Sequence, residues 1–261
     1  MRKQRRSLIS VIVCAHNEEG VIGNCLNSLL SMKIPEAMMV EYFVVLDRCC
    51  DRTKQVVEKM GVPTIEKNFR GCYVSPITEA VAYGIKNTKG DLILVCDADI
   101  QEIPQDALLR LLPCLNGEVK RVSSEVKTRS GKWWLDFLFW LKDLNSKIAP
   151  LGVKPRGAFT VFERQTVEQV GGFDPNKPTW DTAFDLKLEA RGWAVKRVRD
   201  VVVTERRDFA ISRLIQRQIA DGKARRKLRL SFLRTLLHSV FRGRFFVVYG
   251  YIQEAWREKI E

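Results

Sequence analysis

The sequence predicts an α/β fold in which a mostly parallel central sheet is flanked by helices and followed by a basic helical extension. One pattern leads to this fold class, and the length and composition of the chain are compatible with it. Apolar runs of strand length alternate along the chain with segments of helical periodicity. This alternation favours an open sheet with helices on both faces. A chain of 261 residues, 46% hydrophobic and 29% charged, is sufficient for such a domain and is not wholly disordered.

The first half of the chain consists of alternating strands and helices. Leu8–Cys14 is a continuous apolar run, as expected of a buried parallel strand. The segments that follow are helix Gly20–Leu30, strand Tyr42–Leu46, helix Thr53–Met60, a short strand near Ile65, helix Pro76–Lys86, strand Leu92–Cys96 and a helix from Pro104 through Leu112. Ligands of such sheets bind beyond the carboxyl ends of the strands, so the loops there are the first place to look for function.

The second half continues with less regular alternation. The predicted segments are strand Val119–Lys127, amphipathic helix Trp133–Ile148, strand Gly157–Phe162, short helix Thr166–Val170, a Gly171-Gly172 turn, helix Thr182–Ala190 and strand Ala194–Val203. From Asp208 onward the pattern is helical and basic, with a break at Arg242-Gly243. The aromatic residues of the amphipathic helix fit either core packing or contact with a lipid or an acceptor.

The net charge of +13 is concentrated at the two ends of the chain. Residues 1–6 contribute +4 and residues 205–261 contribute +8, whereas residues 7–204 are nearly balanced at +1. A basic tail suits nucleic acid, an anionic membrane surface or a phosphate-bearing substrate, and its ordinary alternative is a solvated helix face. Nucleic acid is the weaker functional option, because zinc-finger spacing, basic-zipper heptads and RNP-like aromatics are all missing from the sequence.

Several other classes are disfavoured by composition. The sequence has no run of 18 uncharged apolar residues, so we expect no membrane-spanning helix. The basic start of the chain leads into an apolar run too short for a secretory signal. Seven cysteines without a CxxC pair, beside two histidines, argue against a disulfide framework or a zinc site. We therefore expect a reducing, cytoplasmic compartment, with peripheral contact to a membrane left open.

Acidic residues follow the predicted strands where phosphate-binding loops are missing. The turn Cys14–Gly20 is not GxGxxG, and the sequence has no GxxxxGK[ST]. Instead, the strand Leu92–Cys96 ends in Asp97-Ala-Asp99, which places two carboxylates on one side of an extended chain. Two such carboxylates repel each other unless a cation lies between them. Mg²⁺ or Mn²⁺ bridging to a diphosphate resolves this repulsion and stabilises a leaving anion.

The acidic pair belongs to a larger set of motifs. The set comprises Ser10-Val-Ile-Val-Cys-Ala-His-Asn-Glu-Glu19, Val45-Leu-Asp-Arg-Cys-Cys-Asp-Arg-Thr53, Asp97-Ala-Asp99, Gly157-Ala-Phe-Thr-Val-Phe162, Val170-Gly-Gly-Phe-Asp174 and Trp180–Trp193. In this order the set resembles the inverting glycosyltransferases of family 2, which have the GT-A fold and include cellulose synthase and dolichol-phosphate mannose synthase. The resemblance covers roughly residues 7–204. The QxxRW motif of the processive members is missing, so the chain is more similar to the non-processive ones.

The resemblance implies a donor site near the strand ends. It implies that Ala15, Asn17 and Glu18 hold the nucleoside and that Asp47 recognises the base. Asp97 would lie near the ribose and the metal, and Asp99 would ligate the metal directly. Gln101 would also approach the metal, as in the polyprenyl-phosphate sugar synthases. Gly172 lies in the segment that matches the loop beside the acceptor.

The general base is less clearly defined. The family usually has Glu-Asp-x-x-Leu at this helix, whereas this chain has Trp180-Asp-Thr-Ala-Phe-Asp185. Asp181 and Asp185 are both candidates and would share a helical face. Asp181 is preferred because its place before Thr182 also suits an N-cap, although a cap alone is its structural alternative. Asp185 is interpreted as a solvated or packing residue.

The predicted function is metal-dependent transfer of one sugar, with inversion, from a UDP- or GDP-linked donor to a hydroxyl or a polyprenyl-phosphate acceptor. Arg206, Arg207 and Arg213 would bind the diphosphate or an acceptor phosphate, unless they are ordinary helix-face arginines. The predicted domains are a glycosyltransferase domain over residues 1–204, split into a donor half (7–115) and an acceptor half (116–204), and an extension over 205–261. The alternatives are a non-catalytic basic module that binds nucleic acid and a nucleotidyltransferase, but Cys14–Gly20 lacks the Gly-rich basic turn expected of the latter.

Overall fold

The computed structural model describes residues 7–130, 132–133, 136–137, 140, 155–206, 211–241 and 243–260. The chain forms two compact units. Unit 1 comprises residues 1–127, 155–176 and 180–206, and unit 2 comprises residues 128–154, 177–179 and 207–261. The basic residues 1–6 and most of the predicted aromatic helix Trp133–Ile148 lie outside the described residues.

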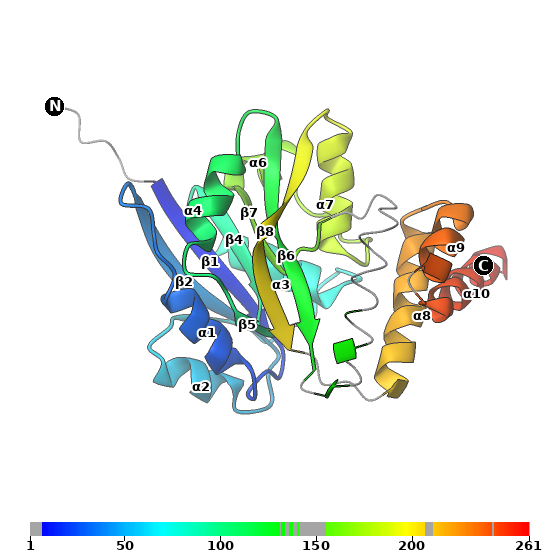
Figure 1. Cartoon of the computed structure of the whole chain (residues 1–261), viewed down its shortest axis with the longest axis horizontal. Coiled ribbons are helices and arrows are strands. Elements are labelled where there is room, and N and C mark those ends of the chain that lie inside the picture. Colours follow the sequence, from blue (N-terminus) through cyan, green and yellow to red (C-terminus); the bar gives the residue numbers. More distant parts are fainter. Residues whose placement is uncertain are drawn as a thin grey trace. The chain divides into compact units, whose positions relative to one another are not determined.

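The main feature of unit 1 is a sheet in which the described strands follow the order β3-β2-β1-β4-β7-β6-β8-β5 (Figure 1). The strands are β1 (Ser7–Ala15), β2 (Met38–Asp47), β3 (Thr64–Lys67), β4 (Leu92–Asp97), β5 (Ile100–Glu102), β6 (Val119–Arg129), β7 (Phe159–Glu163) and β8 (Ala194–Arg206). The strands β1, β2, β3 and β4 are parallel to one another. By contrast, β7 is antiparallel to β4 and β6, and β5 is antiparallel to β8.

The predicted α/β class is therefore confirmed, with one correction. The sheet is mixed, and the expected parallel arrangement holds only for the first half of the chain. An apolar run indicates that a strand is present, but it does not fix the direction in which that strand enters the sheet. The strand β5 was missed altogether, because three residues directly after Asp99 are too few to show a period.

Helices cover both faces of this sheet. They are α1 (Ile22–Leu30), α2 (Thr53–Lys59), α3 (Pro76–Lys86), α4 (Ala107–Leu111) continued by η1 (Leu112–Cys114), α6 (Arg164–Gln169) and α7 (Trp180–Glu189). Side chains of β1 alternate between two cores, as a strand buried on both faces requires. Val11 and Val13 pack with residues of α1, α2 and α4, whereas Ile12 packs with residues of α3, α6 and α7.

The helix α3 carries the chain to the other side of β1. It begins with Ser75 as N-cap, whose side chain accepts a hydrogen bond from the Thr78 amide, and with Pro76 in its first turn. Gly84 lies against the sheet so closely that a Cβ there would be 2.7 Å from a methyl carbon of Ile12. Because of this crossover, β4 pairs with the free side of β1 rather than with β3. The strand order thus reverses between β1 and β4.

An ion pair lies inside the second half of unit 1. The guanidinium of Arg121, on β6, donates to Asp185 Oδ1 at 2.7 Å and Oδ2 at 2.9 Å, and neither residue is exposed to solvent. Arg121 also donates to the Pro155 carbonyl at 2.8 Å. Of the two expectations for position 185, a packing residue is confirmed and a solvated one is wrong, because Asp185 is a buried ion-pair partner that holds α7 against β6.

Unit 2 contains three helices among its described residues: α8 (Ile211–Lys227), α9 (Phe232–Phe241) and α10 (Phe245–Ile260). The helices α8 and α10 cross where Gly222 and Gly250 meet the opposite backbone. A Cβ on Gly222 would overlap the Val247 carbonyl, and one on Gly250 would overlap the Ile219 carbonyl. In the described part of the chain, we find no helix that is both long and apolar enough to cross a membrane.

The buried pair yields a stability prediction. Replacing Asp185 by Asn leaves the Arg121 guanidinium buried without its counter-charge, so the free energy of unfolding should fall by about 3–5 kcal/mol in urea titrations. The double variant R121M/D185L removes both charges and should recover most of the loss, because apolar residues fill the same space.

A surface pair provides the control for that experiment. Asp106→Asn breaks the helical ion pair of Asp106 with Arg110 and should cost no more than about 1 kcal/mol. If D185N were no more destabilising than D106N, the pair would not support the packing of α7.

Candidate active site

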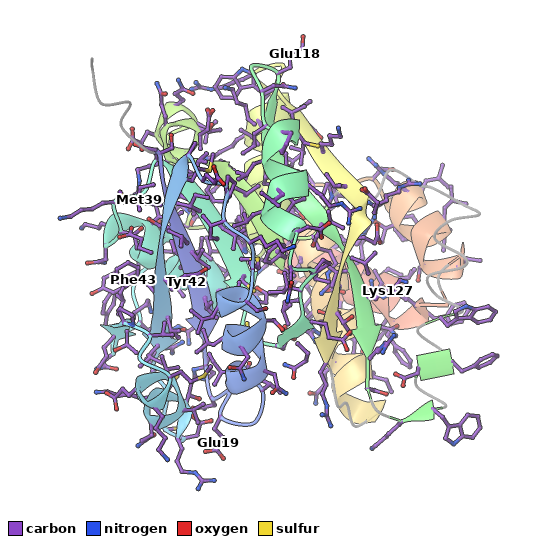
Figure 2. All side chains as sticks on the ribbon, turned by 60° about the vertical axis from the view of Figure 1, so that its left-hand side comes forward. Glu19, Met39, Tyr42, Phe43, Glu118 and Lys127 are labelled. Carbon is purple, nitrogen blue, oxygen red and sulfur yellow. The ribbon has the colours of Figure 1, made fainter. Side chains whose placement is uncertain are left out.

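The candidate site lies at the carboxyl ends of the parallel strands. Cys14 on β1 pairs with Asp97 on β4, so the loops after these strands begin side by side at the point where the strand order reverses. Figure 2 shows Glu19, in the loop after β1, at the opposite end of unit 1 from Glu118, which precedes β6. This arrangement is the usual position of a ligand site in an open α/β sheet.

Asp97 and Asp99 are fixed through their backbones. The Asp97 amide donates to the Ala158 carbonyl at 2.8 Å, which ties the end of β4 to the segment before β7. The Asp99 carbonyl accepts a hydrogen bond of 3.0 Å from the Arg206 amide, at the end of β8. Both acidic residues are half-buried. Two segments that are far apart in sequence therefore converge on the Asp97-Ala-Asp99 turn.

A divalent metal fits this turn only together with a substrate. Among the described residues, no group of three or more His, Cys, Asp or Glu side chains is placed to hold a metal. Mg²⁺ and Mn²⁺ sites in phosphate-transferring proteins, however, are often built from one or two carboxylates completed by phosphate oxygens and water. Asp97 and Asp99 match that pattern of ligands. The Gln101 amide is directed to α1, where its oxygen accepts from Asn24 at 2.9 Å and its nitrogen donates to the Val21 carbonyl at 3.2 Å.

Hydrogen bonds join the loop after β1 to the loop after β2. Asn17 adopts a positive φ of 57°, and its side-chain oxygen accepts from the Cys50 amide at 2.8 Å. The Glu18 amide donates to Thr53 Oγ1 at 2.8 Å. Ala15 is buried at the end of β1, and its carbonyl faces the thiol of Cys49 at 3.4 Å. Ala15, Asn17 and Glu18 thus belong to a pair of hydrogen-bonded loops, 15–19 after β1 and 48–53 after β2, which we call the double loop.

Asp47 is a buried carboxylate with two basic partners. Arg48 donates to both of its oxygens at 2.9 and 3.0 Å, and the ammonium of Lys67 lies 3.0 Å from Oδ1. Lys67 is fully buried and also contacts Glu79 at 2.8 Å. Burial by itself raises the pKa of Asp47, but the bonds from Arg48 and Lys67 outweigh this effect and hold the pKa below its ordinary value. Asp47 is therefore a preorganised, charged acceptor.

Asp181 is joined to the acidic turn through two consecutive residues, Gly157 and Ala158. Its Oδ2 accepts from the Gly157 amide at 2.8 Å, and its Oδ1 accepts from the Thr182 amide at 2.7 Å. Asp181 lies in the first turn of α7, which begins at Trp180, so the expected N-cap position is off by two residues. Gly157 directly precedes Ala158, the residue bonded to Asp97. Asp181 is half-buried, whereas Asp185 is fully enclosed with Arg121 and is not available to a substrate.

An arginine–glutamate pair lies beside the acidic turn. Arg156 donates from both terminal nitrogens to Glu205, at 2.7 Å each, and the Glu205 side chain is 1% exposed. Burial alone lowers the pKa of Arg156, but the charge of Glu205 and its hydrogen bonds raise the pKa, and the charges of Asp97 and Asp99 add to this. The guanidinium therefore lies within the electrostatic range of both acids.

The structure describes two of the residues that were predicted to bind the acceptor, Gly172 and Arg206. Gly172 lies before α7, and its carbonyl accepts from Lys187 on that helix at 2.7 Å. Gly171 and Gly172 have φ of 74° and 73°, a left-handed conformation that favours glycine at both positions. Arg206 is exposed beside Asp99. Arg207 lies outside the described residues, as does the side chain of Arg213.

The sequence was compared with models of known protein families, and one of them matches the segment that contains the donor candidates. The model described as "Glycosyl transferase family 2" matches residues 10–137, which include β1, the double loop and Asp97-Ala-Asp99. Over these residues, which are just under half of the chain, the sequence matches that family. The predicted resemblance is thus confirmed for the segment that holds the donor candidates.

Curated relatives share most of this chain but extend beyond it. The beta-monoglucosyldiacylglycerol synthase of Synechocystis is 26% identical over 203 residues, which are 72% of this chain and 41% of the relative. The probable glycosyltransferase YdaM of Bacillus subtilis is 24% identical over 208 residues, 72% of this chain and 48% of that protein. The chain therefore spans less than half the length of these relatives.

Solved structures share the fold of this chain. A mannosyltransferase from Pyrobaculum calidifontis, in complex with GDP-Man and Mn²⁺, superposes with a TM-score of 0.65 at 19% identity, covering 96% of this chain and 72% of that one. Glucosyl-3-phosphoglycerate synthase from Mycobacterium tuberculosis, in complex with phosphoglyceric acid, gives 0.61 at 18% identity, covering 86% and 81%. Unit 1 has the GT-A fold, as the sequence predicted.

Some residues of the site were missed by sequence reasoning. Lys67 lies opposite Asp47 in the parallel register of β2 and β3, so the position of a lysine at the end of a short strand was a usable signal. Arg156 and Glu205 lie about 50 residues apart and follow no shared motif. Their pairing depends on the antiparallel half of the sheet, whose strand directions the sequence pattern did not give.

Proposed function

We propose that the protein is a metal-dependent, inverting, non-processive glycosyltransferase that moves one sugar from a nucleotide sugar to a lipid-linked acceptor. The observation that carries this proposal is the position of Asp97 and Asp99 at the strand-order reversal of a family 2 domain, with Asp181 tied to them through Gly157. The two acids that would bind the donor, Asp97 and Asp99, then belong to the same site as Asp181, the acid that would act on the acceptor.

The donor is held by the double loop and the acidic turn. Ala15, Asn17 and Glu18 line the nucleoside, and Asp47 accepts from the ring N–H groups of the base. Either uracil or guanine offers such N–H groups, and solved relatives contain UDP-Glc or GDP-Man. Asp97 and Asp99, with Gln101 nearby, would hold Mg²⁺ or Mn²⁺, which supplies positive charge to the departing diphosphate.

Asp181 acts on the acceptor. An acceptor hydroxyl attacks the anomeric carbon, the carbon–oxygen bond to the diphosphate breaks, and the hydroxyl proton passes to the Asp181 carboxylate. Attack opposite to the leaving group inverts the anomeric configuration. The bonds from Gly157 and Thr182 hold the carboxylate in one orientation. Oδ1 accepts from both the amide and the hydroxyl of Thr182, so the second lone pair of Oδ2 is the one that remains for the acceptor.

A lipid acceptor is supported by the surface of unit 2. On α10, Phe245, Tyr249, Ile252 and Trp256 are exposed and recur at helical spacing, so they form one apolar stripe. Leu233, Leu237 and Val240 form a similar stripe on α9. Residues 205–261 carry 14 basic and 6 acidic residues. An apolar stripe on a basic helical unit suits the interface of an anionic membrane, and the Synechocystis relative is named for a glycosyldiacylglycerol product.

The donor is the first testable element. In thermal-shift measurements with UDP- and GDP-sugars, one donor should stabilise the protein by about 2.7 kcal/mol at a concentration 100 times its Kd, a rise in Tm of roughly 5–10 °C. The rise should require Mn²⁺ or Mg²⁺.

Two variants sharpen the donor test. Asp99→Asn should remove the metal-dependent part of the shift. Asp200→Asn, an exposed acid on β8 that is paired with Arg110, should leave the shift intact. A protein that gains no stability from any nucleotide sugar with metal would contradict the proposed function.

The second prediction separates two kinds of acceptor. Asp181→Asn should lower the rate of transfer to a hydroxyl by roughly 10²–10⁴-fold, because the proton then has no carboxylate to receive it. A phosphate acceptor arrives already anionic, so its transfer rate should fall far less. Radiolabelled sugar transfer to a diacylglycerol and to a polyprenyl phosphate, with D106N as control, measures both rates. An equal, large loss with both acceptors would assign Asp181 a role other than proton removal.

The third prediction concerns the membrane. The protein should sediment with phosphatidylglycerol-containing vesicles more than with pure phosphatidylcholine vesicles, and rising salt should weaken the binding. F245S/W256S should lower the partition coefficient by roughly tenfold or more, since two large apolar side chains no longer insert. L30S/L109S, which changes exposed leucines of unit 1, is the matched control. Binding that is absent, or equally reduced by both double variants, would remove α10 as the contact surface.

A further inference from the structure

Arg156 is a guanidinium with unused hydrogen-bonding capacity at the acidic turn. An arginine side chain has five N–H donors. Glu205 accepts one hydrogen from each terminal nitrogen, so within the part of the chain that the structure describes three N–H groups remain for another acceptor. The side chain is 39% exposed, whereas its carboxylate partner is almost completely buried. In this pair, therefore, the carboxylate of Glu205 is buried and the side chain of Arg156 is partly open to solvent.

The backbone places this open end beside Asp97 and Asp99. Arg156 lies two residues before Ala158, whose carbonyl accepts from the Asp97 amide at 2.8 Å. Glu205 is opposite Ile100 in the pairing of β5 with β8, and the next residue along β8 donates to the Asp99 carbonyl at 3.0 Å. Both members of the pair are thus adjacent, through the backbone, to one acid of the turn.

The charges of this cluster select an anion with several oxygens. Glu205 compensates the charge of Arg156, so the pair offers directed donors rather than a free positive charge. Asp97 and Asp99 repel an anion unless a cation lies between. A phosphate that shares its oxygens between such a cation and the remaining N–H groups of Arg156 satisfies both requirements. Guanidinium matches phosphate in geometry better than ammonium does.

We propose that Arg156, oriented by Glu205, binds the donor's diphosphate beside the Asp97–Asp99 turn and stabilises the negative charge that develops on the diphosphate as the sugar leaves. This inference rests on the proposed function and adds a residue to it. Arg156 is the binding residue, and Glu205 is a positioning residue that acts through it. The amide of Gly157, the next residue along the chain, orients Asp181. The segment 156–157 would therefore contact both the leaving diphosphate and the general base, Asp181.

Binding of nucleotides without a sugar tests this proposal. The probes are UDP and GDP, compared with UMP and GMP, in calorimetric titrations with Mn²⁺ and again in EDTA. Arg156→Gln should weaken binding of the diphosphate by roughly 10- to 100-fold, the range of a charge-assisted hydrogen-bond pair. The monophosphate, which lacks the distal phosphate, should bind as it does to the wild type. In EDTA, without a cation to offset Asp97 and Asp99, the diphosphate should bind weakly to the wild type and to the variant alike, so the loss is measured with Mn²⁺.

Two further variants guard against a purely structural effect. Arg156→Lys keeps the charge but loses the two-pronged geometry, so it should show an intermediate loss, and it also serves if R156Q folds poorly. Arg110→Gln breaks another half-exposed arginine–carboxylate pair, with Asp200, six residues before Arg206 on β8. It should leave the affinity for every nucleotide unchanged.

The outcomes separate cleanly. Diphosphate affinity equal to that of the wild type in R156Q and R156K, or an equal loss for the diphosphate and the monophosphate, would overturn the role of Arg156. A loss confined to binding of a phosphate-bearing acceptor would assign the residue to the acceptor instead, and would also overturn it. If the wild type bound no nucleoside diphosphate at all, the proposed function itself would fall.

Discussion

The repulsion between carboxylates gathered at one end of a sheet is the constraint on which this structure depends. The buried acids of unit 1 are each matched by a fixed cation: Asp47 by Arg48 and Lys67, and Glu205 by Arg156. The contacts from Arg48 and Lys67 hold the pKa of Asp47 below its ordinary value, whereas burial alone would raise it. The acidic turn at Asp97 and Asp99 lies at the end of a strand framed by such pairs, where a further cation and a phosphate find complementary charge.

Sequence reasoning succeeded where a pattern has a direct physical meaning. Apolar runs gave the parallel strands, and the motif Asp97-Ala-Asp99 gave the turn at the strand-order reversal. It failed where meaning depends on three-dimensional pairing. Asp185 could be set apart from Asp181 only when it proved to be enclosed with Arg121, and no periodicity in the sequence shows which arginine meets which acid. The direction of β7 and the short strand β5 were equally hidden.

The two halves of the sheet divide the chemistry. The parallel half brings together Asp47, the double loop and Asp97, because α3 carries the chain to the free side of β1. The antiparallel half contributes Arg156 and Asp181 from segments that lie at the same end. A donor and an acceptor can then be held from opposite sides of β4 without any change in the sheet itself.

The glycine crossing of α8 and α10 has a consequence for the orientation of the outer helix. Since Gly250 must face the α8 backbone, α10 has no freedom to turn about its own axis. With about 100° per residue, positions 245, 249, 252 and 256 fall within an arc of roughly 60°, centred about 130° away from Gly250. Gly222 and Gly250 therefore fix the rotation of α10 about its own axis. This rotation determines the direction in which the rings of Phe245, Tyr249 and Trp256 project from the helix.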